Sequence, residues 1–303
     1  MPHATAMVVG TIIGASIFVQ PSEVTGQVPS TWGIYAVWGV AGILTLFGAL
    51  VCAELSSSHP EAGGVYAYLR EAFSPALGFL WGWAMFWTMH TGIIAAIAMV
   101  CARYVGFFVP LGDAGVRGVA VSVVLVLSAV NYVGVRHGTL LQTAFTAGKL
   151  LAIGVMIVAG FVWGGDAHQA AVAASTAADA LGGAATTFGP GDFALALVAG
   201  LFAFGGWHMV TYNAEETVDP VRTIPRALVV GTLTVTACYI LLNAVYLWVL
   251  PLEVVAASDR VAADAADAVL GRGGGMMMSA LVVFSTFGAL SGIILAGPRV
   301  YYA

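Results

Sequence analysis

Residues 10–18 of this chain read GTIIGASIF, a stretch with two glycines, a threonine and a serine inside an otherwise apolar segment. Each of these residues weakens a helix, yet the segment is apolar enough to lie in lipid. A second stretch of this kind, LFAFGGWHM, occupies residues 201–209, with two adjacent glycines at mid-segment. The pair predicts two membrane helices that are interrupted near their centres.

The first stretch also allows a simpler interpretation. Gly10 and Gly14 form a GxxxG pattern, whose usual role in lipid is close helix packing, and taken alone the pattern favours packing. Gly205 and Gly206 shift the interpretation toward broken helices. Matched breaks in two halves of a chain point to a transporter site that is built from inverted repeats.

The composition requires lipid as the main solvent. The chain has 303 residues, of which 60% are hydrophobic and 8% charged, with a mean hydropathy of +0.95. So few charges cannot cover a soluble globule. The net charge of -5 comes without a basic run, which excludes nucleic-acid binding. The three cysteines lie in apolar stretches and are expected to be free thiols.

Eight stretches approach or exceed the roughly 20 apolar residues that a spanning helix needs. They cover residues 4–19, 32–53, 76–104, 117–135, 142–163, 192–212, 226–250 and 276–298. No signal-peptide pattern precedes the first stretch, so it is expected to be retained as a membrane helix. The sequence therefore predicts an all-α integral membrane protein with one multi-pass domain.

Three polar segments are expected to connect the spans. Residues 60–73 are too polar to cross and predict a short helix at the interface. Residues 164–191 are rich in alanine and lack Lys and Arg, and residues 256–271 predict a short amphipathic helix. Its aspartates favour a solvated face over a metal site, because no ligand geometry is implied. They are Asp259, Asp264 and Asp267.

The arginines give a weak indication of orientation. With an even number of spans both termini share one side, and the positive-inside rule favours the cytoplasm by five arginines to four. The cytoplasmic group is Arg70, Arg136, Arg222, Arg226 and Arg299, and the external group is Arg103, Arg117, Arg260 and Arg272. The absence of Lys and Arg from residues 164–191 supports an external position for that loop.

An unwound helix in hydrocarbon is stable only where something satisfies its peptide groups. A free amino acid can do so, because its carboxylate accepts hydrogen bonds at the positive end of a half-helix and its ammonium donates to freed carbonyls. The expected donors are the amides near Ala15, Ser16 and Ile17. The expected acceptors are the carbonyls near Ile12, Phe202 and Gly205. The stretch at residues 10–18 is therefore a candidate cradle for a zwitterion.

Five strings resemble one transporter family, in the family's order and over nearly the whole chain. They are GTIIGASIF (10–18), PEAGGVYAYLREAFSPALGF (60–79), GLFAFGGW (200–207), EETVDPVRTIPRAL (215–228) and FSTFGALSGIILAGPRVYYA (284–303). They resemble the amino acid, polyamine and organocation (APC) transporter superfamily, and within it the L-type amino acid transporters and their bacterial relatives.

The resemblance implies a LeuT-like inverted-repeat fold with alternating access. Residues 1–163 then form the first five-helix repeat, residues 164–191 an external loop, and residues 192–303 an incomplete second repeat. The chain is truncated after the eighth transmembrane helix of the family's usual twelve, which we interpret as a fragment of a longer protein. The expected location is the plasma membrane, the inner membrane in a bacterium, with both termini cytoplasmic.

The resemblance also assigns roles to residues. Phe202 is expected to be an aromatic gate over the substrate, and Gly206 to share the second break. Relatives commonly have Ser-Gly where this chain has Ala15 and Ser16, so a side chain enters a position that is usually bare. His208 follows the tryptophan, where it either contacts substrate or faces water in the cavity.

Lys149 is the only lysine and lies among apolar residues. A charge at membrane depth indicates function, although its long stem could also reach the interface by snorkelling. Related transporters carry a lysine here, where sodium-coupled relatives bind a cation between helices one and eight. The resemblance therefore implies that the Lys149 ammonium replaces sodium, and its protonation is a candidate coupling step.

The expected function is secondary transport of amino acids, sodium-independent and either proton-coupled or by exchange. The alternative is a membrane protein that binds or senses an amino acid or amine without transporting it. No HExxH, GxSxG or P-loop pattern is present, so neither an enzyme nor a cofactor is expected. Some relatives are disulfide-linked to a glycoprotein heavy chain between helices three and four, but residues 106–116 contain no cysteine and predict no such partner.

Overall fold

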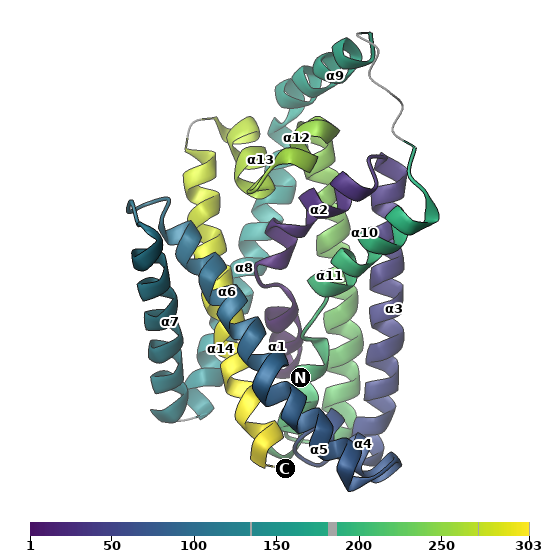
Figure 1. Cartoon of the computed structure of the whole chain (residues 1–303), viewed down its shortest axis with the longest axis vertical. Helices are drawn as coiled ribbons and strands as arrows, with labels where there is room; N and C mark the ends of the chain where they lie inside the picture. Colours follow the sequence, from purple (N-terminus) through teal and green to yellow (C-terminus); the bar gives the residue numbers. More distant parts are fainter. Residues whose placement is uncertain (134, 181–186, 272, 303) are drawn as a thin grey trace.

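The computed structural model describes residues 1–133, 135–180, 187–271 and 273–302, and the elements among them are all helices (Figure 1). The longer ones are α3 (Thr31–Ser58), α5 (Pro75–Ala84) continuing through the π-helical turn η2 (Met85–Met89) into α6 (His90–Val105), α7 (Asp113–Val133), α8 (Val135–Trp163), α10 (Pro190–Ala203), α11 (Pro220–Val249) and α14 (Gly274–Tyr302). The shorter ones are α1 (Pro2–Ile12), η1 (Ser16–Phe18), α2 (Gln20–Gln27), α4 (Val65–Ala72), α9 (Gly165–Ala180), η3 (Trp207–Glu216), α12 (Leu252–Ala257) and α13 (Val261–Leu270). The all-α prediction is confirmed.

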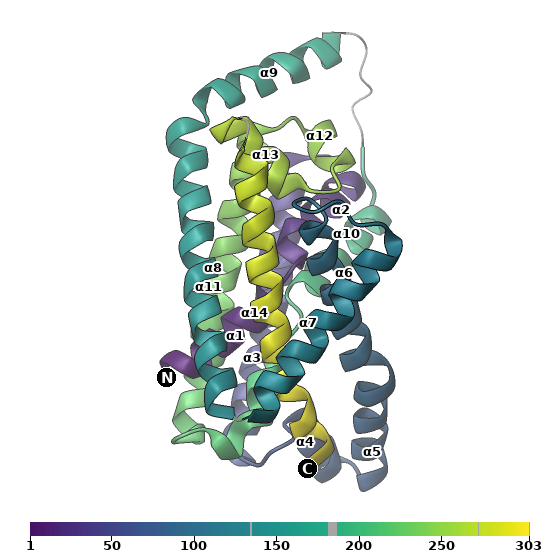
Figure 2. The same cartoon turned by 90° about the vertical axis from the view of Figure 1, so that its left-hand side faces the viewer.

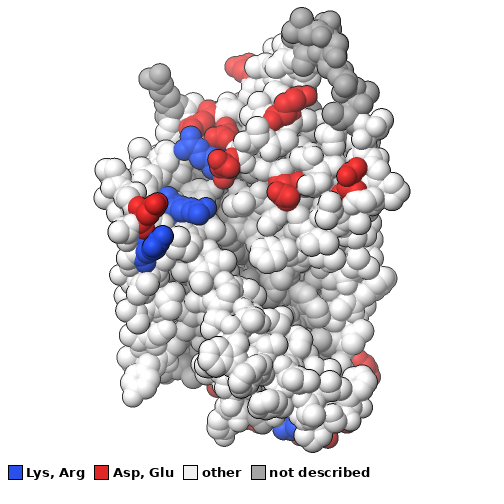
Figure 3. Space-filling model, in the orientation of Figure 1, with Lys and Arg blue, Asp and Glu red and all other residues white. Residues whose placement is uncertain are grey.

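Seven helical stretches of the described chain are long and apolar enough to cross a membrane. The first expected span, at residues 4–19, is not one continuous helix, because α1 ends at Ile12 and α2 begins only at Gln20. Large apolar side chains cover the outer surface, among them Leu125 of α7 and Leu151 of α8. Charged side chains on the visible face gather toward its ends and leave an uncharged band between (Figure 3). The chain is an integral multi-pass membrane protein.

Helices fill the expected connecting segments. The short helix predicted within residues 60–73 is α4, at the lower end in Figure 1, and the one predicted within 256–271 is α13. In α13, Asp264 accepts a hydrogen bond from the Ser258 hydroxyl and forms a salt bridge with Arg260. The stretch 164–191 contains α9, while its residues 181–186, like Arg272 and the side chain of Arg136, lie outside the described residues.

The helix α1 lies at the centre of the bundle, packed against α8, α11, α14 and η3 (Figures 1 and 2). Around this centre α3 packs on α11, and α6 packs on α14. In Figure 1 the chain rises from α1 to α2, whereas it descends from α10 toward the lower end. Two segments far apart in sequence, α1 and η3, therefore meet inside the bundle with opposite direction.

Candidate functional site

The first break lies between α1 and η1. The helix stops at Ile12, and a single turn of 3₁₀ helix begins at Ser16. Within the described part of the chain, the amides of three successive residues donate no hydrogen bond; they are Ala15, Ser16 and Ile17. Unpaired N–H groups in sequence at the start of a helical turn form a site suited to an anion.

The second break lies between α10, which ends at Ala203, and η3, which begins at Trp207. Gly206 adopts a left-handed conformation, with φ of 105°, and a Cβ there would lie 3.0 Å from the Thr11 carbonyl oxygen. Only glycine allows both this conformation and this approach. The Thr11 hydroxyl donates to the Gly206 carbonyl at 3.1 Å, so the two breaks lie side by side. The prediction of two interrupted helices is confirmed.

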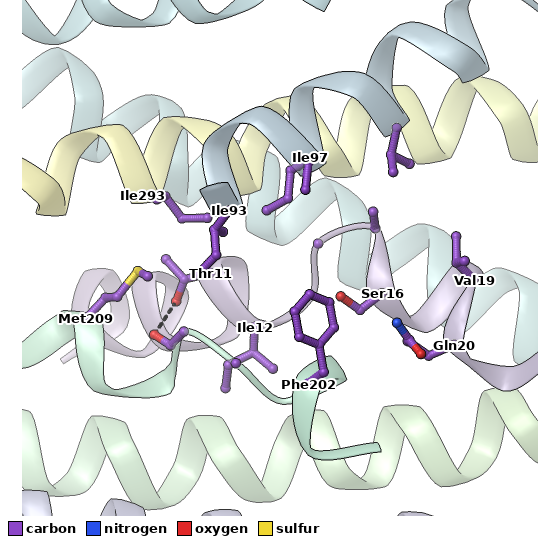
Figure 4. Close-up of a pocket in the computed structure, with 16 residues that line it drawn as sticks. Thr11, Ile12, Ser16, Val19, Gln20, Ile93, Ile97, Phe202, Met209 and Ile293 are labelled. Carbon is purple, nitrogen blue, oxygen red and sulfur yellow. Dashed lines mark hydrogen bonds between the residues drawn. The ribbon is translucent and has the colours of Figure 1, made fainter. Parts of the chain in front are cut away.

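A cavity of about 210 Å³ lies between the breaks and is called the central cavity (Figure 4). Six of the eight predicted substrate residues line it: Ile12, Ala15, Ser16, Phe202, Gly205 and Gly206. The side chain of Phe202 is 60% exposed and faces Ser16 across the cavity. The remaining lining residues include Ile93 and Ile97 of α6, and no Asp, Glu, Lys or Arg is among them. The side chains that line the central cavity are therefore uncharged.

Two of the predicted residues do not line the central cavity. Ile17 is fully buried in the core, and His208 packs its ring against Trp207 and Tyr212. Because η1 has only three residues, consecutive side chains leave it in different directions, and Ser16 rather than Ile17 points at the cavity. His208 belongs to the aromatic packing beneath the break.

Lys149 of α8 holds the first break together. Its side chain is 0% exposed, and its ammonium donates to the carbonyls of Gly10 at 3.0 Å, Ile13 at 2.6 Å and Ser285 of α14 at 3.1 Å. The ammonium therefore links the end of α1 to α14, as a bound cation would. The snorkelling alternative is wrong, because the head group is buried among carbonyls rather than at the interface.

Two residues that the sequence did not single out also satisfy the breaks. The Tyr239 hydroxyl, on α11, donates to the carbonyl of Ile12 at 3.1 Å and to that of Ala203 at 3.0 Å. The Ser285 hydroxyl donates to the Gly14 carbonyl at 3.2 Å. Tyr239 thus connects the two breaks directly.

These contacts change the expected set of acceptors. The Ile12 carbonyl accepts from Tyr239 and the Phe202 carbonyl from the Gly205 amide at 3.0 Å, so neither is a free acceptor. At the two breaks, the carbonyls that accept no hydrogen bond from described residues are those of Thr11, Phe204 and Gly205. Of the three predicted acceptors, Gly205 remains.

The central cavity continues toward the upper end of the molecule. It shares Val19, Gln20 and Val100 with a wider hollow of about 970 Å³, which Arg103 and Arg260 also line. Figure 3 shows this face hollowed beside basic side chains. At the lower end Arg299 of α14 pairs with Glu216 of η3 at 2.9 Å. The central cavity thus shares lining residues with the upper hollow, and the Glu216–Arg299 pair lies at the other end of the molecule.

Known proteins resemble this chain along nearly its whole length. The family model described as amino acid permease matches residues 1–303. Similar proteins include the serine/threonine exchanger SteT of Bacillus subtilis, 33% identical over 99% of this chain and 66% of its own. The b(0,+)-type amino acid transporter 1 of Homo sapiens is 33% identical over 98% of this chain and 60% of its own. The large neutral amino acids transporter small subunit 2 of Homo sapiens is 33% identical over 99% of this chain and 56% of its own length.

This chain thus spans between 56% and 66% of the length of these relatives. Their names are those of transporters and an exchanger rather than enzymes, in agreement with the prediction that the chain is not an enzyme. The broken helices, the lysine at the first break and the match over every residue lead to one conclusion: the chain belongs to the amino acid permease family, within the APC superfamily of transporters.

Proposed function

We propose that the chain transports small neutral amino acids by alternating access, with the zwitterion bound between the two breaks. The observation that carries the proposal is the pairing of free peptide groups across one cavity. Unpaired amides of Ala15 and Ser16 lie on one side, and unpaired carbonyls of Thr11 and Gly205 lie on the other. Such groups are stable in lipid only when a ligand or water satisfies them.

The lining of the central cavity restricts the substrate. Its volume of about 210 Å³ lies below the roughly 300 Å³ at which pockets for drug-sized ligands begin. The Ser16 side chain occupies part of it, and no charged side chain is present to bind a charged substrate group beyond the zwitterion. Relatives are named for serine, threonine and large neutral amino acids, which makes these the first substrates to test.

Lys149 supplies a fixed positive charge at the break. Because the Lys149 ammonium bridges α1 and α14 in place of a bound cation, the cycle needs no sodium, and either proton transfer at this amine or amino acid exchange drives it. We assign the upper end as external and both termini as cytoplasmic, in a plasma or bacterial inner membrane. Residues 1–163 and 192–303 are the two repeats, residues 164–191 their external connection, and no disulfide-linked heavy chain attaches.

The test is uptake by the purified chain in proteoliposomes without sodium. Vesicles preloaded with unlabelled L-threonine should take up radiolabelled L-threonine, L-serine or L-leucine faster than empty vesicles. Replacing Ser16 by Trp fills the central cavity and should abolish uptake, whereas the lipid-facing control Leu195→Ala should not change it.

Two results would count against the proposal. Uptake that is unaffected by Ser16→Trp would place the substrate elsewhere. Saturable binding of these amino acids without any flux would favour the alternative, a membrane protein that binds or senses an amino acid without carrying it.

A further inference from the structure

A second cavity, of about 270 Å³, lies on the opposite side of the contact between Thr11 and Gly206 and is called the lower cavity. Met7 lines it one turn before Thr11, and Val210 lines it directly after Met209, which belongs to the central cavity. The two cavities are therefore neighbours along both α1 and η3, separated by the joined breaks.

Two buried carboxamides face the lower cavity without partners. Gln142 of α8 is 2% exposed, and within the described chain neither its Oε1 nor its Nε2 makes a hydrogen bond. Asn213 of η3 is 8% exposed; its Nδ2 contacts only the sulfur of Met7, at 3.1 Å, and its Oδ1 has no partner. Buried polar atoms are normally satisfied, so these three atoms indicate a ligand or water in the space that they border.

The neighbouring helices are shaped to hold the Gln142 amide. A Cβ at Gly10 of α1 or at Gly292 of α14 would collide with its Nε2 atom. Glycines on two different helices therefore leave the space that this side chain occupies. A carboxamide that is enclosed in this way keeps one orientation, which is what a binding group requires.

The polarity of the lower cavity favours a cationic head group. It presents the oxygens of Gln142 and Asn213 and the Glu216 carboxylate, whose charge Arg299 shares. Among the buried side-chain atoms that border this cavity in the described chain, the unpaired donor is Gln142 Nε2, while Met1 and His3 line its exposed edge. A primary ammonium, with three donors and no acceptor, fits this set, and Nε2 remains for a carboxylate oxygen.

We propose that the lower cavity is a second binding site for the same amino acid, occupied after the substrate leaves the central cavity. The ammonium binds the Gln142 and Asn213 oxygens, and the carboxylate accepts from Gln142 Nε2. This inference rests on the proposed function. It adds a station between the central cavity and the Glu216–Arg299 pair, so that release proceeds in two steps.

The test is the stoichiometry of radiolabelled L-threonine bound to the purified full chain, measured by equilibrium dialysis. The wild type should bind two molecules, one of them at least tenfold more weakly. The double variant Gln142→Leu, Asn213→Leu should keep the tighter site and lose the weaker one. Ser16→Trp should keep only the weaker site. Asn131→Leu, which removes an unpaired amide oxygen on α7 away from both cavities, is the matched control.

A variant that binds more tightly is also needed, because a loss of binding could result from misfolding and a gain could not. Asn213→Asp places a carboxylate at the ammonium position and should tighten the weaker site about fivefold, because hydrogen bonds to charged groups are stronger. One bound molecule in the wild type, with no change in any lower-cavity variant, would overturn this inference and leave the proposed function standing. Wild-type binding by Ser16→Trp would instead overturn the proposed function.

Discussion

The two breaks are stabilised in different ways. At the first, between Ile12 and Ser16, side chains from three other helices occupy the freed carbonyls: Lys149, Tyr239 and Ser285. At the second, between Ala203 and Trp207, the backbone turns through the left-handed Gly206, hydroxyls of Tyr239 and Thr11 donate to the carbonyls at its two ends, and the two carbonyls between them, of Phe204 and Gly205, stay unpaired. The first break is stabilised mainly by donors brought by tertiary packing, whereas the second also requires the left-handed conformation of one glycine.

This difference teaches how an interrupted membrane helix can be kept both stable and usable. If donors occupied every freed group, no substrate could bind; if none did, the break would be too costly in lipid. Here the carbonyl side of the first break is largely satisfied, and its amides, together with the carbonyls of the second break, remain available. The four substitutions below test the comparison, from the largest expected effect to the smallest.

Lys149→Met should have the largest effect. It leaves the Gly10, Ile13 and Ser285 carbonyls without their shared ammonium, at a cost of about 5 kcal/mol, because three hydrogen bonds to a charged group are lost and each is worth about 1.5–3 kcal/mol. The melting temperature in detergent should fall steeply, and uptake should be lost. Leu151→Met on the lipid-facing side of the same helix is the control. An unchanged melting temperature for Lys149→Met would refute the support of the first break by donors.

Gly206→Ala should destabilise the second break by about 1–3 kcal/mol. The alanine must adopt a left-handed backbone conformation, and its Cβ would lie 3.0 Å from the Thr11 carbonyl oxygen. Gly205→Ala is the matched control, since Gly205 has no positive φ and its Cβ would meet only the Phe202 carbonyl, at 3.1 Å. Thermal melting of both variants checks the prediction, and equal losses would mean that the left-handed conformation is not what sustains this break.

Tyr239→Phe should cost about 1–2 kcal/mol, because it removes the hydroxyl that serves both Ile12 and Ala203. Tyr246, seven residues later on α11, is equally buried, but its hydroxyl has no partner among the described residues. Tyr246→Phe should therefore be neutral or slightly stabilising. Comparing the melting temperatures of the two variants isolates the contribution of the Tyr239 hydroxyl to stability. Identical changes in melting temperature would show that its hydrogen bonds to the two breaks contribute nothing.

Ser285→Ala should have the smallest effect, about 0.5–1 kcal/mol, since the Gly14 carbonyl loses one neutral hydrogen bond at 3.2 Å. The backbone carbonyl of residue 285 still accepts the hydrogen bond from Lys149. Ser291→Ala, in the same helix and with an unpaired hydroxyl, should change the melting temperature by less. A larger loss at Ser291 than at Ser285 would contradict the assignment.

The sequence was sufficient for features that stand out against an apolar background. Glycine pairs at mid-span and a single lysine in a membrane segment are rare, and each led to the correct place in the fold. Tyr239 could not be found in this way. It lies in an apolar run together with Tyr246, and only the packing of α1 on α11 decides which hydroxyl reaches the breaks.

The side-chain directions at the breaks were also beyond the sequence. The predicted binding set included His208, whose ring joins an aromatic cluster away from the central cavity, and Ile17, which was predicted for its amide and whose side chain lies in the core. Gln142 is the first residue of an expected span, and a polar residue at the end of a membrane helix gives no indication of function. Its role depends on Gly10 and Gly292, which come from distant parts of the chain and leave space for it.

The Tyr239 hydroxyl carries one hydrogen but lies within bonding distance of two peptide oxygens, 3.1 Å and 3.0 Å away. It cannot serve both at full strength at once. Any small shift of α1 relative to α10 lengthens one of these distances and gives the proton to the other oxygen. The phenol is therefore shared between the two breaks, so that a displacement of either one changes the hydrogen bonding of the other.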